Sequence, residues 1–385
     1  MRRVAIIGTG HGRFGVRDDA TVQELAFEAY REAVGEAGID PKEIAASWIA
    51  AVPEYHKQRS LAGVVQEYLG LNPRPTWLTE AACASGSAAL HSAWTAVAAG
   101  LYDLALVVGC QKMSELETPE ILALMGRVGD VQWESVFGST FPGYYALFAR
   151  RHMERYGTTR EQLAAVAVKN HDYGVLNEKA MFRKPASLEK VLASAPVADP
   201  LRVFDCCANA DGAACLLLAS EERARTLGAE VVWLDGLGAA SAPMSVLRRD
   251  DLCSLPSAVE AGRQAYAMAG IGPEQIQVAA VHDCFTIAEI IALEDLAFCA
   301  PGEGGPLSES GGTRIGGRIP VNVDGGLKAK GHPIGATGVS MAVEIVRQLR
   351  GACGARQVEG AGLGLTHNVG GIGQYCFVNV FRRES

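Results

Sequence analysis

The chain has 385 residues, of which 49% are hydrophobic and 20% are charged, and its formal net charge at pH 7 is −8. This composition is typical of a globular protein that is long enough for two domains, and it excludes a disordered chain. Because the chain is acidic and has no cluster of Lys and Arg, a surface dedicated to nucleic acid or to an anionic membrane is excluded. A small-molecule substrate fits better.

The ten cysteines are spread over the whole length, and only Cys206 and Cys207 are adjacent. No paired Cys-x-x-Cys spacing occurs, so we expect no metal site. The basic pair Arg2-Arg3 is followed by only a short apolar run, which does not fit a secretory signal, and no apolar stretch is long enough to cross a bilayer. These features predict a cytoplasmic protein with reduced thiols and no membrane partner.

The first 220 residues alternate apolar strands with amphipathic helices. Strands are predicted at 4–9, 46–52, 75–80, 104–109 and 213–219, and helices at 22–37, 62–70 and 85–100. The segment Gly8-Thr9-Gly10-His11-Gly12 suggests a dinucleotide-binding loop, but the third glycine of that motif is replaced by Arg13. We therefore interpret this segment as a turn that ends the first strand.

The last 165 residues or so repeat the same order of elements. Strands are predicted at 230–238, 276–281, 319–323, 361–366 and 374–381, and helices at 257–270, 286–298 and 335–350. The pattern predicts a duplicated α/β protein with an N-terminal half at 1–220 and a C-terminal half at 221–385. Only the first half carries a long insertion, at about 112–210, which we interpret as a loop domain that covers a site.

Residues capable of catalysis follow the predicted strands, where open α/β sheets bind their ligands. Cys83 follows the strand at 75–80 and precedes a helix, whose amino terminus favours a thiolate, although a buried thiol of the core would show the same local pattern. The other groups are His282 to Phe285, Gly331 to Gly338, and His367 to Gly371. A two-fold duplication would bring all four segments to one crevice.

These four segments, read as Ala-Cys-Ala-Ser-Gly-Ser, His-Asp-Cys-Phe, Gly-His-Pro-Ile-Gly-Ala-Thr-Gly and His-Asn-Val-Gly-Gly, resemble the motifs of the thiolase superfamily. The resemblance covers nearly the whole chain and is strongest to archaeal-type and sterol-carrier-type acetyl-CoA acetyltransferases. It implies a duplicated fold of two similar mixed sheets with helices in layers and an inserted loop domain. Common degradative thiolases have Asn-Glu-Ala-Phe in place of 282–285 and Cys-x-Gly near 367–370, so this chain departs from them at both positions.

The resemblance also implies roles for individual residues. Cys83 would be the nucleophile that becomes acylated, His332 its base, and Cys284 the second acid/base. The enolate oxygen would be held by His332 and His282. The acyl oxyanion would be held by backbone N–H groups of Cys83 and Gly370, and His367 and Asn368 are possible further members of the site. Cys376 is a second candidate for the role of Cys284, but the alternating strand around it favours packing.

The implied activity is acyl transfer between CoA thioesters, run as thiolysis of a 3-oxoacyl-CoA or as Claisen condensation. Coenzyme A would be a substrate, and no permanently bound cofactor is expected. A ketosynthase or a hydroxymethylglutaryl-CoA synthase remains an alternative, although Cys284 has no clear use there. A thiolase-like retro-aldolase typically lacks the nucleophile, so Cys83 counts against it, and a non-catalytic scaffold that binds acyl-CoA also remains open.

The expected partners are acyl-CoA and CoA, a second copy of the chain in a homodimer or homotetramer, and a complex with hydroxymethylglutaryl-CoA synthase and a small bridging protein. Residues that contact CoA are not identified by the sequence. Lys112, Arg183 and Lys184 lie in or near the loop domain, but a solvated surface explains them equally well. Acyl chain length, direction of reaction and oligomeric state are left open.

Overall fold

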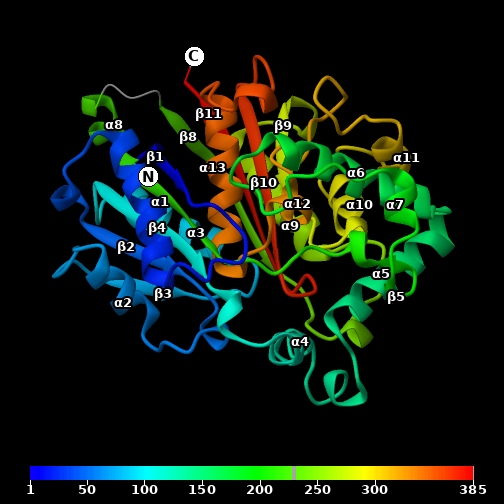
Figure 1. The fold of residues 1–385 in the computed structure, drawn as a ribbon. Helices are drawn as coiled ribbons and strands as arrows, with labels where there is room; N and C mark the ends of the chain where they lie inside the picture. Colours follow the sequence, from blue (N-terminus) through cyan, green and yellow to red (C-terminus); the bar gives the residue numbers. More distant parts are fainter. Residues whose placement is uncertain (228–230, 385) are drawn as a thin grey trace.

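A computed structural model describes residues 1–227 and 231–384 of the chain (Figure 1). Nine strands form one mixed sheet in the order β3-β2-β4-β7-β1-β8-β11-β10-β9. The strands are β1 (Val4–His11), β2 (Ala46–Ala50), β3 (Thr76–Thr79), β4 (Leu104–Gln111), β7 (Gly212–Ser220), β8 (Val232–Ser241), β9 (Val278–Val281), β10 (Leu363–Gly370) and β11 (Tyr375–Arg383). The first five in spatial order come from the N-terminal half, and the last four come from the C-terminal half.

The helices belong either to the two halves or to the inserted segment. Those of the two halves are α1 (Val22–Ala37), α2 (Leu61–Tyr68), α3 (Ser85–Ala98), α8 (Glu221–Leu227), α9 (Pro256–Ala269), α10 (Thr286–Asp295), α11 (Gly304–Glu309), α12 (Gly326–Lys330) and α13 (Thr337–Leu349). The inserted segment contributes α4 (Thr118–Gly126), α5 (Phe141–Tyr156), α6 (Arg160–Leu176) and α7 (Leu188–Leu192), with a small hairpin of β5 (Pro196–Ala198) and β6 (Leu201–Arg202). None of the helices among the described residues is both long and apolar enough to cross a membrane.

The helices α3 and α13 lie between the two halves (Figure 1). Their apolar residues form one buried cluster with strands of both halves. The helices α1 and α2 cover the outer face of the N-terminal strands, and α5, α9 and α10 cover the outer face of the C-terminal strands. The result is five layers of alternating helices and strands, which confirms the predicted layered α/β fold.

The duplication is visible in how each half holds its first long helix. A Cβ on Gly10 of β1 would lie 1.8 Å from the carbonyl oxygen of Ala29 in α1, and a Cβ on Gly238 of β8 would lie 1.8 Å from the carbonyl oxygen of Ala261 in α9. Gly8 and Gly236 approach the same two helices one turn further on. The turn predicted around Gly8 to Gly12 is therefore wrong, because Gly8 and Gly10 lie inside β1 and allow α1 to pack closely.

The structure differs from the predicted topology at three points. The halves share one sheet because β1 and β8 pair in antiparallel fashion through Ala5 with Trp233 and Ile6 with Val232. The strand predicted at 319–323 forms only an isolated bridge between Ala279 and Val321, because Asn322 adopts a left-handed φ of 55° and bends the chain away. The strand predicted from residue 230 begins at Val232, and residue 230 itself lies outside the described residues.

Candidate active site

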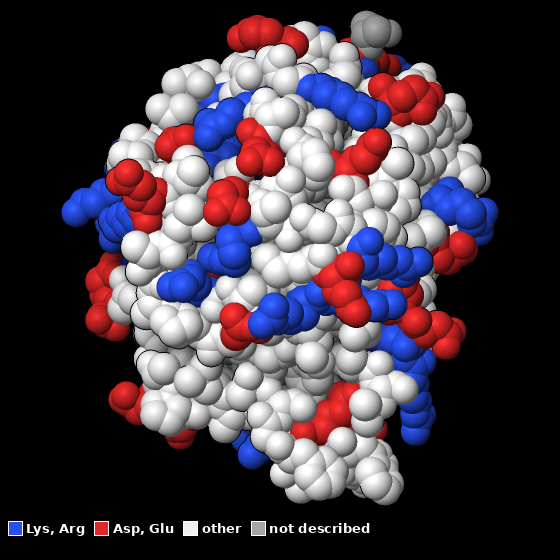
Figure 2. Space-filling view, turned by 90° about the vertical axis from the view of Figure 1, so that its right-hand side faces the viewer, with Lys and Arg blue, Asp and Glu red and all other residues white. Residues whose placement is uncertain are grey.

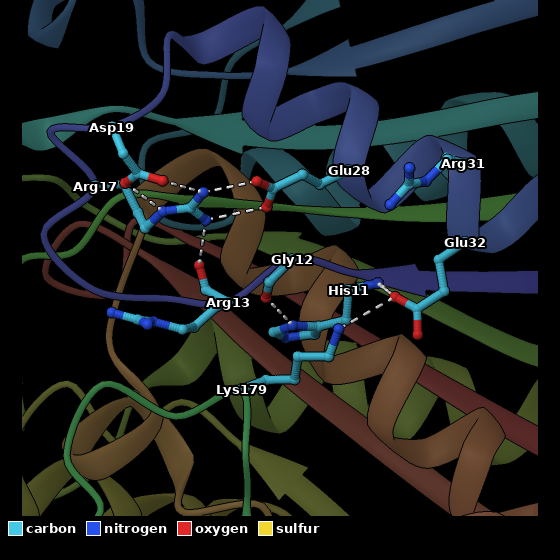
Figure 3. Close-up of a pocket in the computed structure, with 9 residues that line it drawn as sticks. All are labelled: His11, Gly12, Arg13, Arg17, Asp19, Glu28, Arg31, Glu32 and Lys179. Atoms are coloured by element: carbon cyan, nitrogen blue, oxygen red, sulfur yellow. Dashed lines mark hydrogen bonds and ion pairs between the residues drawn. The ribbon is translucent and has the colours of Figure 1, made fainter.

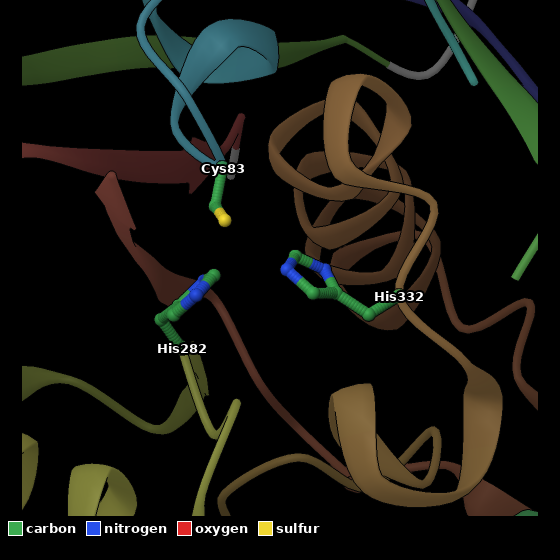
Figure 4. A group of neighbouring side chains, drawn as sticks. All are labelled: Cys83, His282 and His332. Atoms are coloured by element: carbon green, nitrogen blue, oxygen red, sulfur yellow. The ribbon is translucent and has the colours of Figure 1, made fainter. Parts of the chain in front are cut away.

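Three buried side chains from distant parts of the sequence meet at one point (Figure 4). The sulfur of Cys83 and one ring nitrogen each of His282 and His332 all lie within 4.8 Å of one another. Cys83 is at the turn before α3, His282 follows β9, and His332 follows α12. The fold therefore brings these three predicted site residues together, as the duplication led us to expect.

The turn that presents Cys83 is strained and tightly held. Ala82 has a left-handed φ of 51°, a conformation that costs a residue with a Cβ roughly 1–2 kcal/mol. The hydroxyl of Ser85 accepts a hydrogen bond from the N–H of Ala81 at 2.9 Å and donates one to the carbonyl of Ala82 at 2.6 Å. These bonds hold the turn so that Cys83 points into the site, as strained backbone often does at reactive residues.

The predicted thiolate at Cys83 is wrong for the free site. Burial raises the pKa of Cys83 to about 12, and backbone N–H groups of Gly371 and of Cys83 itself offset only part of this effect. Burial also lowers the pKa of His332 to about 3. The loss of solvation outweighs the partial charge of the helix end, so the resting pair is a neutral thiol beside a neutral imidazole.

The tautomer of His332 follows from its hydrogen bonds. Thr337 donates its hydroxyl proton to the carbonyl of Pro333 at 2.9 Å, so its oxygen must accept from Nδ1–H of His332 at 2.7 Å. The proton of the neutral ring therefore resides on Nδ1. The other nitrogen, Nε2, is buried, has no partner among the described residues, and carries a lone pair that can accept a proton.

His282 has the opposite tautomer. The side-chain amide of Asn368 donates to the carbonyl of Cys83 at 3.0 Å, and this bond fixes its NH₂ group toward the site. The same NH₂ group lies 3.2 Å from Nδ1 of His282, which must then be the acceptor. The proton of His282 resides on Nε2, which is buried and free of partners within the described chain. The two histidines thus present one acceptor and one donor.

Cys284 and Tyr145 complete the polar part of the site. The hydroxyl of Tyr145 donates a hydrogen bond to the carbonyl oxygen of Gly371 at 3.2 Å and lies beside the thiol of Cys284. Burial raises the pKa of Cys284 well above the ordinary value of a thiol, and Tyr145 opposes that rise. The ring of Tyr145 stacks on Phe285, with ring centroids 4.5 Å apart. The inserted segment therefore contributes directly to the site.

The remaining predicted residues lie nearby or in the core. His367, Asn368 and Gly370 are within β10 rather than after it, because that strand continues to Gly370. His367 is buried with both ring nitrogens free of partners in the described part of the chain, and burial lowers its pKa to about 4. Cys376 lies in β11 inside a hydrophobic cluster, as expected for a packing residue.

Three contributors to this geometry were not predicted as site residues. Thr337 stands five positions after His332 in the Gly-His-Pro segment, which places it on the first turn of α13. Tyr145 belongs to an aromatic cluster of the inserted segment, where its hydroxyl was the only signal of a polar role. Gly371, next to the predicted Gly370, has a left-handed φ of 61° and turns its N–H toward the thiol.

A thiol and two imidazoles are also the side chains that bind zinc and similar ions. Cys83, His282 and His332 are close enough together to hold one. The sequence led us to expect no metal, because paired Cys-x-x-Cys spacing is missing. The same three groups serve equally as nucleophile, base and hydrogen-bond donor, and their opposed tautomers suit those roles.

Charged clefts also lie outside this group of residues. A cleft of about 790 Å³ contains the cations Arg13, Arg183, Lys184, Lys190 and Lys328, together with the rings of Phe182 and Phe204. Figure 2 shows the side of the molecule that carries α7, where basic side chains, with acidic ones among them, form a band across the middle. Lys112 is not in this cleft, because its ammonium group bonds the carbonyl of Arg17 and the hydroxyl of Ser114.

Another cleft, of about 710 Å³, lies beside the end of β1 (Figure 3). Its charged groups are largely paired with each other. Arg17 bonds both Asp19 and Glu28, and Lys179 lies 3.6 Å from Glu32. We assign no chemistry to this cleft.

The chain has relatives that match it over its whole length. Residues 4–222 match the family model of the thiolase N-terminal domain, and residues 238–383 match that of the thiolase C-terminal domain-like family. An acetyl-CoA acetyltransferase of Methanothermobacter thermautotrophicus is 42% identical over 385 residues and covers 100% of both chains. Sterol carrier protein 2 of Oryctolagus cuniculus is 32% identical, over 99% of this chain and 72% of that protein. The solved structure of an Ltp2-ChsH2(DUF35) aldolase has a TM-score of 0.87 and 26% identity, covering 99% of this chain and 98% of that one.

These matches define an acyl-transferring enzyme built on a duplicated α/β fold. The chain belongs to the thiolase family. The predicted family, fold class and type of enzyme are therefore confirmed.

Proposed function

We propose that this protein transfers acyl groups between CoA thioesters through an acyl-enzyme at Cys83, as an acetyl-CoA acetyltransferase or 3-oxoacyl-CoA thiolase. One observation carries the proposal: Cys83, His332 and His282 converge with one imidazole ready to accept a proton and the other ready to donate a hydrogen bond. A nucleophile, its base and a donor for a developing oxyanion are the groups that thioester chemistry needs.

In the first step Nε2 of His332 takes the proton of the Cys83 thiol, and the sulfur attacks the 3-oxo carbonyl carbon of the substrate. The negative charge that develops on that oxygen is held by the N–H groups of Cys83 and Gly371, both of which face the sulfur. We assign this role to Gly371 in place of Gly370, which packs its Cα against the carbonyl of Ala81. Removing one such donor typically costs about 10²–10³ in rate.

Collapse of this intermediate breaks the carbon–carbon bond. The acyl group stays on Cys83, and the electron pair of the broken bond leaves as the enolate of acetyl-CoA. Nε2–H of His282 and the newly protonated Nε2 of His332 hold the enolate oxygen. Cys284 gives its proton to the enolate carbon, and Tyr145 hydrogen-bonds the sulfur that remains. This assignment uses both tautomers deduced above.

In the second half of the reaction a CoA thiol replaces acetyl-CoA and gives its proton to the thiolate of Cys284, and its sulfur attacks the acyl group on Cys83. The sulfur of Cys83 then leaves and takes back the proton from Nε2 of His332. The products are a shortened acyl-CoA and the free thiol of Cys83, and Cys284 and His332 return to their starting states. Run backwards with acetyl-CoA alone, the same groups condense two acetyl units. CoA acts as a substrate throughout, and no permanently bound cofactor takes part.

The cationic cleft is the place we assign to the phosphates and adenosine of CoA. It holds five cations and one carboxylate, Glu178, with two aromatic rings on which a purine can stack. Its wall includes Cys206, and the N–H of the adjacent Cys207 donates to the carbonyl of Cys284 at 2.9 Å. The thiol end of a bound CoA can therefore reach the catalytic groups.

We also propose that the protein is cytoplasmic and forms a homodimer or homotetramer, with room for a complex with hydroxymethylglutaryl-CoA synthase and a bridging protein. Two uncovered apolar areas support association. The edge strand β3 exposes Trp77 and Leu78 at 42% and 41%. The lower end of the molecule, after α4, exposes Trp133 and Phe137 at 62% and 78%. Light scattering coupled to gel filtration tests the assembly.

Thiolysis of acetoacetyl-CoA by the pure chain with added CoA tests the activity. Incubation with acetyl-CoA followed by peptide mass spectrometry should show one acetyl group on Cys83, and the Cys83→Ala variant should carry none. Acetylation of another cysteine would refute the assignment. If neither reaction occurs with the chain alone or with the proposed partners, a scaffold role explains the protein better.

A further inference from the structure

A small apolar pocket opens at Cys83. Its volume is about 280 Å³. It lies between the 3-10 helix Pro53–Tyr55, the turn of Cys83, the helix α4 and the start of α5. The apolar residues around the thiol are Val52, Tyr55, Leu124, Met125, Val128, Phe141 and Ile334.

This pocket and the cationic cleft have no lining residue in common. One is charged and suits the phosphate end of CoA, while the other is apolar and contains the nucleophile. An acyl group bound to the sulfur of Cys83 must point away from the CoA that delivered it. The apolar pocket is therefore the space that receives the acyl chain.

The pocket is larger than an acetyl group requires. An apolar cavity of about 150 Å³ is enough to hold a benzene ring of six carbons. A pocket of about 280 Å³ that is open on one side therefore accommodates an acyl chain of about that size or somewhat larger, with the rest of its volume opening to solvent. Each methylene buried against such walls strengthens binding by roughly fourfold.

The mouth of the pocket discriminates by charge. Its charged residues are Glu54, Glu80 and Arg127, all exposed to solvent, so carboxylates outnumber cations two to one. An acyl chain that ends in a carboxylate would approach two like charges, whereas a neutral chain meets no such penalty.

We propose that this enzyme accepts neutral, apolar acyl groups of about four to eight carbons on Cys83, and that Met125 and Val128 limit their length. Both residues are half-buried and line the pocket, on the end of α4 and just after it. The proposal rests on the acyl transfer proposed above and names the substrate class of the same site.

A panel of substrates tests the proposal with the wild-type enzyme. Thiolysis of 3-oxooctanoyl-CoA, which leaves a hexanoyl group on Cys83, is expected to have a kcat/KM at least equal to that of acetoacetyl-CoA. 3-Oxoadipyl-CoA, which leaves a succinyl group, should react at least tenfold less efficiently than 3-oxohexanoyl-CoA. A kcat/KM for 3-oxooctanoyl-CoA below that of acetoacetyl-CoA overturns the inference but leaves acyl transfer standing. Failure of every substrate overturns both.

Variants of Met125 test whether this residue forms the wall that limits the length of the acyl chain. Met125→Trp should lower the ratio of kcat/KM for 3-oxooctanoyl-CoA over acetoacetyl-CoA by at least tenfold, and Met125→Ala should raise the ratio for 3-oxodecanoyl-CoA. The matched control is Leu122→Trp on the same helix, where the side chain is 53% exposed and does not line the pocket. The control should leave the ratio within twofold. Unchanged ratios in both Met125 variants would remove Met125 from the wall and contradict the inference.

Discussion

Asn368 offers the sharpest test of the two tautomers. Its NH₂ group donates to the carbonyl of Cys83 at 3.0 Å, and this bond orients the amide. The same NH₂ group lies 3.2 Å from Nδ1 of His282 and thereby sets the tautomer of that ring. Asn368→Asp replaces that donor by a carboxylate of the same shape. The proton of His282 must then move to Nδ1 to face the carboxylate, and Nε2 presents a lone pair to the enolate oxygen.

The expected loss can be worked from these bonds. Losing one oxyanion donor costs about 10²–10³ in kcat, or about 2.7–4 kcal/mol. Asn368→Ala removes the bond without forcing the wrong tautomer, so its loss should be smaller, near the value of one neutral hydrogen bond, about 1 kcal/mol, or about fivefold. The order of the two variants is the more decisive result. Asn368→Asp should lose more kcat than Asn368→Ala, because the carboxylate changes the tautomer of His282, whereas truncation to alanine only removes a hydrogen bond.

The assay separates the enolate step from acylation. We expect Asn368→Asp to exchange the methyl protons of acetyl-CoA with deuterated solvent far more slowly than the wild type. Acetylation of Cys83 should fall less, because Gly371 and Cys83 supply that oxyanion site. The control is Asn379→Asp, a buried Asn paired with His91 at 2.8 Å outside the site, which should lower the melting temperature without slowing exchange. Exchange in Asn368→Asp within threefold of wild type, or faster than in Asn368→Ala, would refute the tautomer assignment.

Three further predictions follow from the same geometry. Burial raises the pKa of Cys83 to about 12, so the reactive thiolate forms only as the pH rises. The rate of alkylation by iodoacetamide should therefore increase from pH 7 to 9.5 without levelling off. A plateau below pH 8 would instead show that Cys83 forms an ion pair. Thr337→Val removes the acceptor that holds Nδ1–H of His332, so kcat should fall by about fivefold or more, and an unchanged kcat would argue against this tautomer. Tyr145→Phe removes the hydroxyl at Cys284 and should slow solvent exchange of acetyl-CoA by about fivefold while sparing acetylation of Cys83; equal slowing of both would indicate a merely structural role.

The repeat of strands and helices was readable from the sequence because hydrophobic periodicity is a local property. The helix at 22–37 is an example, since Thr21 and Glu24 cap its start and Gly38 follows its end with a left-handed φ of 63°. Hydrophobic periodicity wrongly predicted a strand at 319–323. The segment is apolar, but the left-handed φ of Asn322 bends its backbone out of a strand conformation. Periodicity also misplaced Gly8 and Gly10, because a glycine that lets a helix approach cannot be told locally from one that makes a turn.

The sequence predicted most of the residues of the site, but it did not predict their protonation states. Cys83, His282 and His332 carry chemically distinctive side chains in recognisable segments. The protonation of those groups depends on burial and on partners such as Thr337 and Asn368, which only the folded chain brings into contact. A helix terminus alone favours a thiolate, and the sequence does not show how little solvent reaches the sulfur.

The paired glycines of β1 and β8 limit how either half can change. Where a methyl group would stand 1.8 Å from a helix carbonyl, no other residue fits without moving an entire layer. The halves carry different catalytic groups, and the long inserted segment belongs to the first, yet both have glycine at this contact. Gly10 and Gly238 therefore mark equivalent positions from which the other differences between the halves can be measured.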